Sequence, residues 1–305
     1  MQYLMDGQCI IYKLLIMEKL VTKETLKKVV ETIANKIASF DTTINTFINN
    51  FSTMDNNDNA LLQSDLIEVS RNKGLTFYIV TGGTINWKRP DVFGGTKVHG
   101  IIYYKINNET EWHQLDSSNS TKRSFSVNAG DVVHIGGDNY TGTNADNQMG
   151  YSPGFTVSEG CTFWITGNIL SLVNKENFSS LTELTAPGQF NMLFYNCTGL
   201  LLVKNLYLPT NTTPYCYNYM FNGCSSLIGS IELPATLTTA NCYCSMFRNT
   251  QISDITVRAT NIASNAFNSW LDSNTISDGV IRKSAALELP TGASGVPEGW
   301  TTVEI

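Results

Sequence analysis

The chain has 305 residues, of which 42% are hydrophobic and 15% are charged, and its net charge is −6. This length fits about two domains, and the apolar content suffices for buried cores. The acidic balance argues against a nucleic-acid-binding protein, which needs a basic surface, and no segment approaches the roughly 20 apolar residues of a membrane span.

The N-terminal residues 1–16 lack the features of a signal peptide. Their apolar stretch Cys9–Ile16 is interrupted by Lys13, and neither a basic leading region nor a small-residue cleavage site is present. We interpret this segment as an unstructured leader or an artefact of start-site choice. An exported protein with this sequence is expected to leave the cell without a recognisable secretion signal.

Residues 17–73 are predicted to form a helical coiled-coil stem. They contain neither Pro nor Gly, and their apolar residues recur at alternating steps of four and three, the heptad pattern of left-handed coiled coils. The residues predicted to mediate oligomerisation are Leu26, Val30, Ile33, Ile37, Phe40, Ile44, Phe47, Phe51 and Met54. Isoleucine at the a positions favours a homotrimer over a dimer. The alternative is an amphipathic helix that packs against the body of the same chain.

Residues 74–167 are predicted to form a small antiparallel β-sandwich. The apolar pattern has a period of two in Leu75–Val80, a further strand is expected at Ile101–Ile106, and the turn sequence Asn128–Asp131 separates two later strands. The polar stretch Gly136–Pro153 is expected to be an exposed loop.

Trp87 and Trp112 in this module have two interpretations. Aromatic rings stack on sugars, so both residues are candidates for a carbohydrate platform, but in a small sandwich we expect both to belong to the core. His134 lies between Asp131 and Asp138, as it would in a metal site. No second His or Cys lies nearby, so no metal site is predicted.

Residues 168–305 contain an internal repeat. Phe194, Phe221 and Phe247 follow one another at intervals of 27 and 26 residues, and each is preceded by Leu or Met. Between these positions lie short apolar strands such as Ile231–Leu233, which is followed by a proline. A single repeat cannot bury its apolar residues alone, whereas stacked repeats can, so the pattern predicts a solenoid.

Each repeat is predicted to combine one short helix with one short strand. Cys216, Met220 and Cys224 are spaced by four, which is typical of one face of a helix, and Gly223 is suited to end it. The seven cysteines of the chain are odd in number and match no zinc-binding pattern. We therefore expect most of them to be small buried hydrophobic residues.

Successive strands of such a solenoid present one residue each to the outside in a column. Leu206 and Leu208 are expected to point inward, which leaves Tyr207 outside, and the same alternation places Glu232 and Thr256 on the outer face. Repeat proteins use this face for recognition, so Tyr207, Glu232 and Thr256 are the predicted partner-binding residues. The alternative is a solvated face with no partner.

The repeat sequence Met220-Phe-Asn-Gly-Cys224 resembles BspA-like leucine-rich repeats, which occur in surface proteins of gut bacteria and in virion proteins of tailed phages. Gly74–Trp87 and Tyr103–Trp112 resemble the β-module that often precedes such repeats, and Gly295–Trp300 is similar to their C-terminal cap. The resemblance covers roughly residues 74–305. It implies an α/β leucine-rich-repeat solenoid over residues 168–305.

The sequence as a whole predicts a non-enzymatic structural and adhesion protein. The leading hypothesis is an oligomeric phage fibre on the virion surface, of the head or the tail, which contacts capsid or other virion proteins through its N-terminal region and binds a host-surface glycan or protein. The alternative is a bacterial cell-surface adhesin. A glycosidase needs two carboxylates at a defined separation, and no motif sets such a pair. No phosphate loop, nucleophile elbow or zinc-protease motif occurs, so neither catalytic nor cofactor-binding residues are predicted.

Overall fold

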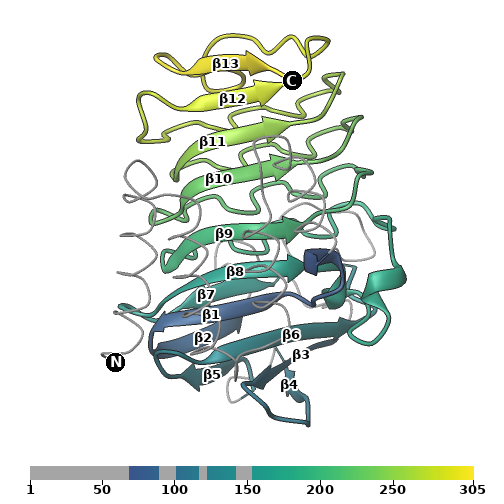
Figure 1. Ribbon diagram of the computed structural model, residues 1–305, viewed down its shortest axis with the longest axis vertical. Helices are drawn as coiled ribbons and strands as arrows, with labels where there is room; N and C mark the ends of the chain where they lie inside the picture. Colours follow the sequence, from purple (N-terminus) through teal and green to yellow (C-terminus); the bar gives the residue numbers. More distant parts are fainter. Residues whose placement is uncertain (1–68, 89–100, 117–121, 142–152) are drawn as a thin grey trace, which may run out of the picture. The chain divides into compact units, whose positions relative to one another are not determined.

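The computed structural model of the chain describes residues 69–88, 101–116, 122–141 and 153–305 (Figure 1). The described residues all belong to one unit. The strands of the described part are β1 (Thr76–Thr81), β2 (Gly83–Lys88), β3 (Ile101–Ile106), β4 (His113–Leu115), β5 (Ser124–Val127), β6 (Val132–Asp138), β7 (Gly154–Val157), β8 (Thr162–Asn168), β9 (Leu200–Tyr207), β10 (Ile228–Leu233), β11 (Gln251–Val257), β12 (Val280–Lys283) and β13 (Thr301–Glu304). Two short 3-10 helices, η1 (Ile169–Leu172) and η2 (Phe178–Ser180), follow β8.

One ten-stranded sheet runs through the whole unit, in the order β13-β12-β11-β10-β9-β8-β1-β6-β3-β4. Its solenoid strands pair in parallel, because each begins one full turn after the last, whereas β1, β6, β3 and β4 pair antiparallel. Figure 1 shows β8 to β13 stacked in this order along the long axis. A second sheet, β5-β2-β7, packs against the antiparallel part. Phe77 of β1 and Phe155 of β7 meet between the two sheets, with ring centroids 5.1 Å apart.

The fold class expected from the sequence is wrong. The described chain is almost entirely β, and its repeats form a β-solenoid of about 4 turns in place of an α/β leucine-rich-repeat solenoid. No α-helical coiled coil is seen in the described residues, and the heptad residues Leu26 to Met54, on which the stem was predicted, lie outside them. A heptad spacing shows only which residues are apolar and does not identify the surface that they meet.

The β-module and the solenoid share one sheet without a break. The expected boundary between residues 167 and 168 falls inside β8, which pairs antiparallel with β1 on one side and parallel with β9 on the other. The loop expected from Gly136 also begins later, because Gly136 and Gly137 belong to β6 and Tyr140 is fully buried.

The return segments of the solenoid are runs of consecutive turns, not helices. The backbone N–H groups of Tyr217, Tyr219 and Phe221 donate to carbonyls of the next repeat at 2.9–3.0 Å. The N–H groups of the residues between them close local turns instead, as in the bond from Met220 to the Tyr217 carbonyl at 3.1 Å. An α-helix would keep all of these bonds within itself. Here half of them join one repeat to the next.

Left-handed residues at every fourth position make these turns. In one return segment the φ angles of Tyr215, Tyr219 and Gly223 are 61°, 55° and 77°. A run of turns with this period buries every fourth side chain, and Cys216, Met220 and Cys224 are accordingly fully buried. A helix would also bury residues at this spacing, which is why the sequence pattern was consistent with the wrong structure.

The solenoid core consists of columns of identical or similar side chains. One aromatic column contains Phe194, Phe221, Phe247 and Trp270, with successive ring centroids 5.6, 5.9 and 6.2 Å apart. The six cysteines in the described part are all buried free thiols, which confirms the expectation for them. Burial raises the pKa of the Cys242 thiol to about 11, so that it stays protonated and unreactive at neutral pH.

Substitutions at Asn249 distinguish the turn structure from a helix. This residue is exposed and has a φ of 56°. Asn249→Ala is expected to lower the free energy of unfolding by about 1 kcal/mol, because alanine keeps the Cβ but lacks the short polar side chain that makes the left-handed region accessible to asparagine. Asn249→Gly should leave it within a few tenths of a kcal/mol of the wild type. Urea unfolding of both variants measures the order, and greater stability of the alanine variant, as in a helix, would contradict the structure.

Candidate functional site

The outer face of the ten-stranded sheet carries an unbroken row of apolar side chains. Residues paired in register point to the same side of a sheet, so these side chains stand in line across five neighbouring strands. The row consists of Val132, Tyr78, Trp164, Leu202 and Ile228, each paired with the next. Ile228 is 52% exposed and the other four are partly exposed. We call these five residues the apolar row.

The sequence analysis did not identify the apolar row as a site. Its signal was present, because the strands that contain it are apolar on both faces, as in Phe77-Tyr78-Ile79 and Phe163-Trp164-Ile165. Such strands usually have both faces covered. In the structure Phe77 and Ile165 face the core and are fully buried, whereas Tyr78 and Trp164 lie on the outer face.

Tyr78 and Trp164 form the centre of the apolar row. Their rings are parallel within 4° and their centroids are 4.0 Å apart. Because the two residues are cross-strand partners, this stacking means that the rings stand upright on the sheet. One face of the Trp164 indole is therefore covered by Tyr78, and the other is turned toward Leu202 and Ile228.

Basic side chains lie next to the apolar row on the same face. Lys105 pairs in register with His134, which pairs with Thr76. Burial, and then the charges of Lys105 and Lys73, lower the pKa of His134. The Thr76 hydroxyl donates to the Gly74 carbonyl at 2.8 Å, so in its 3.4 Å contact with His134 Nδ1 it is the acceptor.

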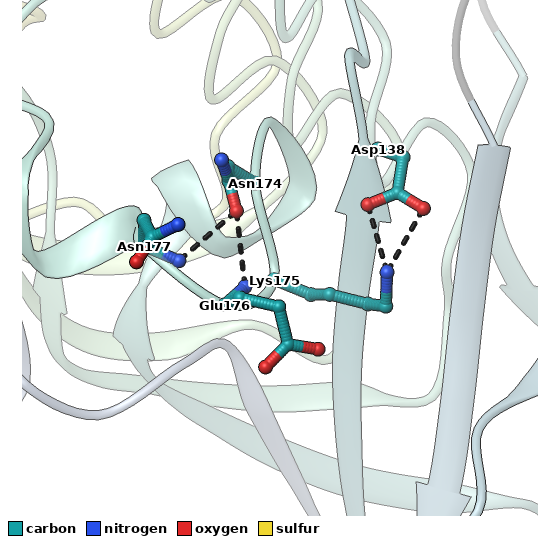
Figure 2. Close-up of polar contacts among 5 residues, drawn as sticks. All are labelled: Asp138, Asn174, Lys175, Glu176 and Asn177. Atoms are coloured by element: carbon teal, nitrogen blue, oxygen red, sulfur yellow. Dashed lines mark hydrogen bonds and ion pairs between the residues drawn. The ribbon is translucent and has the colours of Figure 1, made fainter.

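A polar cluster at the end of β6 has a structural role. Lys175 Nζ lies 2.8 and 2.9 Å from the two carboxylate oxygens of Asp138, and 4.6 Å from the Tyr103 ring centroid. Burial and a hydrogen bond to Asp138 raise the pKa of Tyr103. Figure 2 shows the Lys175–Asp138 pair beside Asn174, whose side-chain oxygen accepts from the backbone N–H groups of Glu176 and Asn177. These contacts hold the segment that leads from η1 into the solenoid.

The backbone of this segment crosses β6 very closely. A Cβ placed on Gly137 would lie 1.9 Å from the carbonyl oxygen of Leu172, so only glycine fits there. Within this cluster, the Lys175 ammonium and the Asp138 carboxylate are already paired with each other. Neither is offered to a ligand.

The two tryptophans considered from the sequence have different environments. Trp87 is 1% exposed and packs between Tyr140 and Phe155, so its expected place in the core is confirmed. Trp112 is partly exposed on the outer face, with Lys105 Nζ 4.9 Å from its ring centroid. The prediction that both are core residues is wrong for Trp112, because it follows a turn at the edge of the sheet, where no second layer of the described residues covers it.

Two of the three predicted partner-binding residues lie side by side. Glu232 and Thr256 are register partners on β10 and β11. Tyr207 instead pairs with Asn168 on β8 and packs partly against the core, with the guanidinium of Arg71 5.9 Å from its ring centroid. In the described part β9 and β10 pair only at Leu202 and Ile228, so the column does not extend from Glu232 to Tyr207.

Two arginines neutralise the carboxylates of Glu232 and Asp254. Arg258 Nε donates to Glu232 at 2.8 Å, and Arg282 donates to both carboxylate oxygens of Asp254 at 3.2 and 3.0 Å. Such exposed pairs contribute little to stability, about 0–1 kcal/mol each. The Glu232 carboxylate on this part of the outer face is therefore already paired.

The remaining predicted site residues lie outside the described part of the chain. These are the nine heptad residues from Leu26 to Met54. Among the described residues there is no group of three or more His, Cys, Asp or Glu side chains able to hold a metal ion. Within the same residues no helix is both long enough and apolar enough to span a membrane.

Comparison with known proteins gives no family model, no curated protein and no solved structure that matches this chain. The similarity to BspA-like repeats therefore rests on the motifs of the sequence alone. The outer face, with its apolar row and adjacent lysines, is the candidate functional site.

Truncation of the two tryptophans tests the difference in their environments. Trp87→Ala is expected to lower the free energy of unfolding by about 3–5 kcal/mol, as large buried aromatic deletions do. Trp112→Ala is expected to cost only about 1–2 kcal/mol, because part of the ring already contacts water. Denaturant unfolding of both variants measures this, and equal losses would show that Trp112 is as well packed as Trp87.

Acidification should destabilise the protein through His134. Its pKa in the folded state lies below the ordinary value of 6.5, so the unfolded chain binds the proton more readily. The stabilising contribution of the neutral ring is present above pH 6.5 and is lost as the pH falls through the folded-state pKa. Thermal unfolding from pH 8 to pH 5 should therefore show a smaller loss in His134→Gln than in the wild type. An unchanged pH profile in this variant would assign the acid sensitivity to other groups.

Proposed function

We propose that the protein is a non-enzymatic structural and adhesion protein that presents the outer face of its ten-stranded sheet to a partner surface. The apolar row carries this proposal. Exposed apolar side chains are ordinary when scattered singly, but a contiguous row marks an interaction surface. The row includes a tyrosine and a tryptophan, two of the residue types enriched in binding hot spots.

The scaffold supports recognition by a rigid surface. The apolar row spans strands of both the antiparallel module and the solenoid, and hydrogen bonds between repeats hold the return segments behind it. Binding at such a face costs less conformational entropy than binding that must first order flexible loops. A rigid face of this kind is suited to adhesion.

The setting that we propose is the surface of a phage virion, with the bacterial cell surface as the alternative. In either setting the N-terminal region would associate with other copies and with capsid or other surface proteins. Several copies on one particle would raise the avidity of a weak site. Immunogold labelling of a producing culture, with an antibody against residues 153–305, distinguishes the two: label on particles supports the virion, and label on the cell envelope supports the adhesin.

A charge within the apolar row tests the proposed function. Ile228→Glu is expected to weaken binding of the purified protein to its target cells tenfold or more, because burying an unpaired carboxylate in an apolar contact costs well over 1.4 kcal/mol. Leu237→Glu is the matched control, since Leu237 is 62% exposed and lies outside the row. Flow cytometry of labelled protein on a panel of intact bacteria gives the measurement. Equal binding of both variants and the wild type would remove the apolar row from consideration.

A further inference from the structure

The apolar row contains a step beside Trp164. One face of the indole is covered by Tyr78, and its register partners on the other side are Leu202 and then Ile228. Leucine and isoleucine side chains are shorter than an indole, so the upper part of the free indole face stands above them. Trp164 thus forms a wall, and Leu202 and Ile228 form a floor.

Gly229 keeps the floor low. Its φ is +91°, a conformation that side-chain-bearing residues rarely adopt, and a Cβ there would lie 2.9 Å from Leu202 Cδ1. Any residue larger than glycine at position 229 would therefore clash with the Leu202 side chain. The resulting floor is apolar and open on the outer side, as the 52% exposure of Ile228 indicates.

Polar side chains border the step on one side. Thr166, Lys204 and Ser230 follow Trp164, Leu202 and Ile228 by two residues on their strands, and alternate residues of a strand share a face. Thr166 is partly exposed, and Lys204 and Ser230 are exposed. Two hydroxyl groups and one ammonium group therefore lie beside an aromatic wall.

The charge of this border is positive. Lys204 forms no ion pair with a carboxylate of the described residues, whereas Arg258, which directly follows β11, and Arg282 on β12 are both paired. Lys73 and Lys105 lie further along the same face and lower the pKa of His134. In a chain with a net charge of −6, this local excess of cations favours an anionic ligand.

We propose that the step binds a saccharide that carries an acidic group. A pyranose ring has an apolar C–H face, which fits the indole wall, and an edge of hydroxyl groups, which fits Thr166 and Ser230. Its carboxylate or phosphate group pairs with Lys204. A neutral apolar ligand would leave the ammonium unused, and a neutral sugar would lack the charge contact. This inference rests on the proposed function and identifies the class of partner.

The test uses the full chain and matched ligands in titration calorimetry. The ligands are oligomers of galacturonate, glucuronate and mannuronate, the methyl ester of each, and a phosphate-bearing sugar oligomer. The wild type is expected to bind at least one acidic oligomer at least tenfold more tightly than its uncharged form. Lys204→Gln should reduce that affinity to the level of the ester and leave the ester unchanged. Lys283→Gln, on the distal strand β12, is the control and should bind as the wild type does.

A second variant tests the wall. Trp164→Ala should lose binding of acidic and esterified oligomers alike, and Trp164→Phe, which keeps an aromatic face, should recover part of it. Circular dichroism confirms that each variant folds. Three outcomes would overturn the proposal. The esters bind as tightly as the acids, Lys204→Gln binds as the wild type does, or no acidic oligomer binds. Binding of the phosphate-bearing oligomer alone would identify phosphate as the acidic group.

The two proposals fail separately. Cell binding that depends on Ile228, together with no saccharide binding, would overturn the saccharide and leave the adhesive face in place. Absence of any Ile228-dependent cell binding would overturn the proposed function itself.

Discussion

Half of the backbone N–H groups in the return segments of the solenoid point along its axis to the next repeat, and the rest of the architecture depends on these bonds. Each segment thereby acts as a hydrogen-bonded wall, in the same way that each strand acts as part of a sheet. A repeat is bonded to its neighbours on both its strand side and its turn side. Identical positions are brought into line, so aromatic rings stack in columns, and each stacked pair contributes about 0.5–1.5 kcal/mol beyond its buried area.

The same constraint extends the sheet beyond the solenoid. β8 is the last parallel strand and also the partner of the antiparallel β1, so the module and the solenoid share one surface. Side chains from both parts meet only because this sheet is continuous. Tyr78 belongs to the module and Ile228 to the solenoid, yet both stand in the apolar row. The proposed binding surface therefore belongs to neither part alone.

The charges of the outer face divide it into two regions. Beside β10 to β12, Arg258 and Arg282 are paired with Glu232 and Asp254, so these four charges cancel. Nearer the module, Lys105 and Lys204 have no carboxylate partner among the described residues, and the apolar row lies beside them. We therefore propose the junction of module and solenoid as the partner-binding face, in place of the predicted column at Glu232 and Thr256.

The sequence by itself determined the repeat, its period, several of the strands and the burial of the cysteines, because these follow from which residues are apolar and how they are spaced. Only the tertiary structure decided how the chain returns between strands. A spacing of four at Cys216, Met220 and Cys224 is buried equally well by a helix and by turns with a left-handed residue at every fourth position. The sequence likewise did not determine on which face of the sheet Tyr78, Trp164 and Leu202 lie, because this depends on the register between strands that are far apart in the chain. The local sequence pattern shows which residues are apolar. Strand register and the direction of the backbone depend on contacts with residues that are far apart in the sequence.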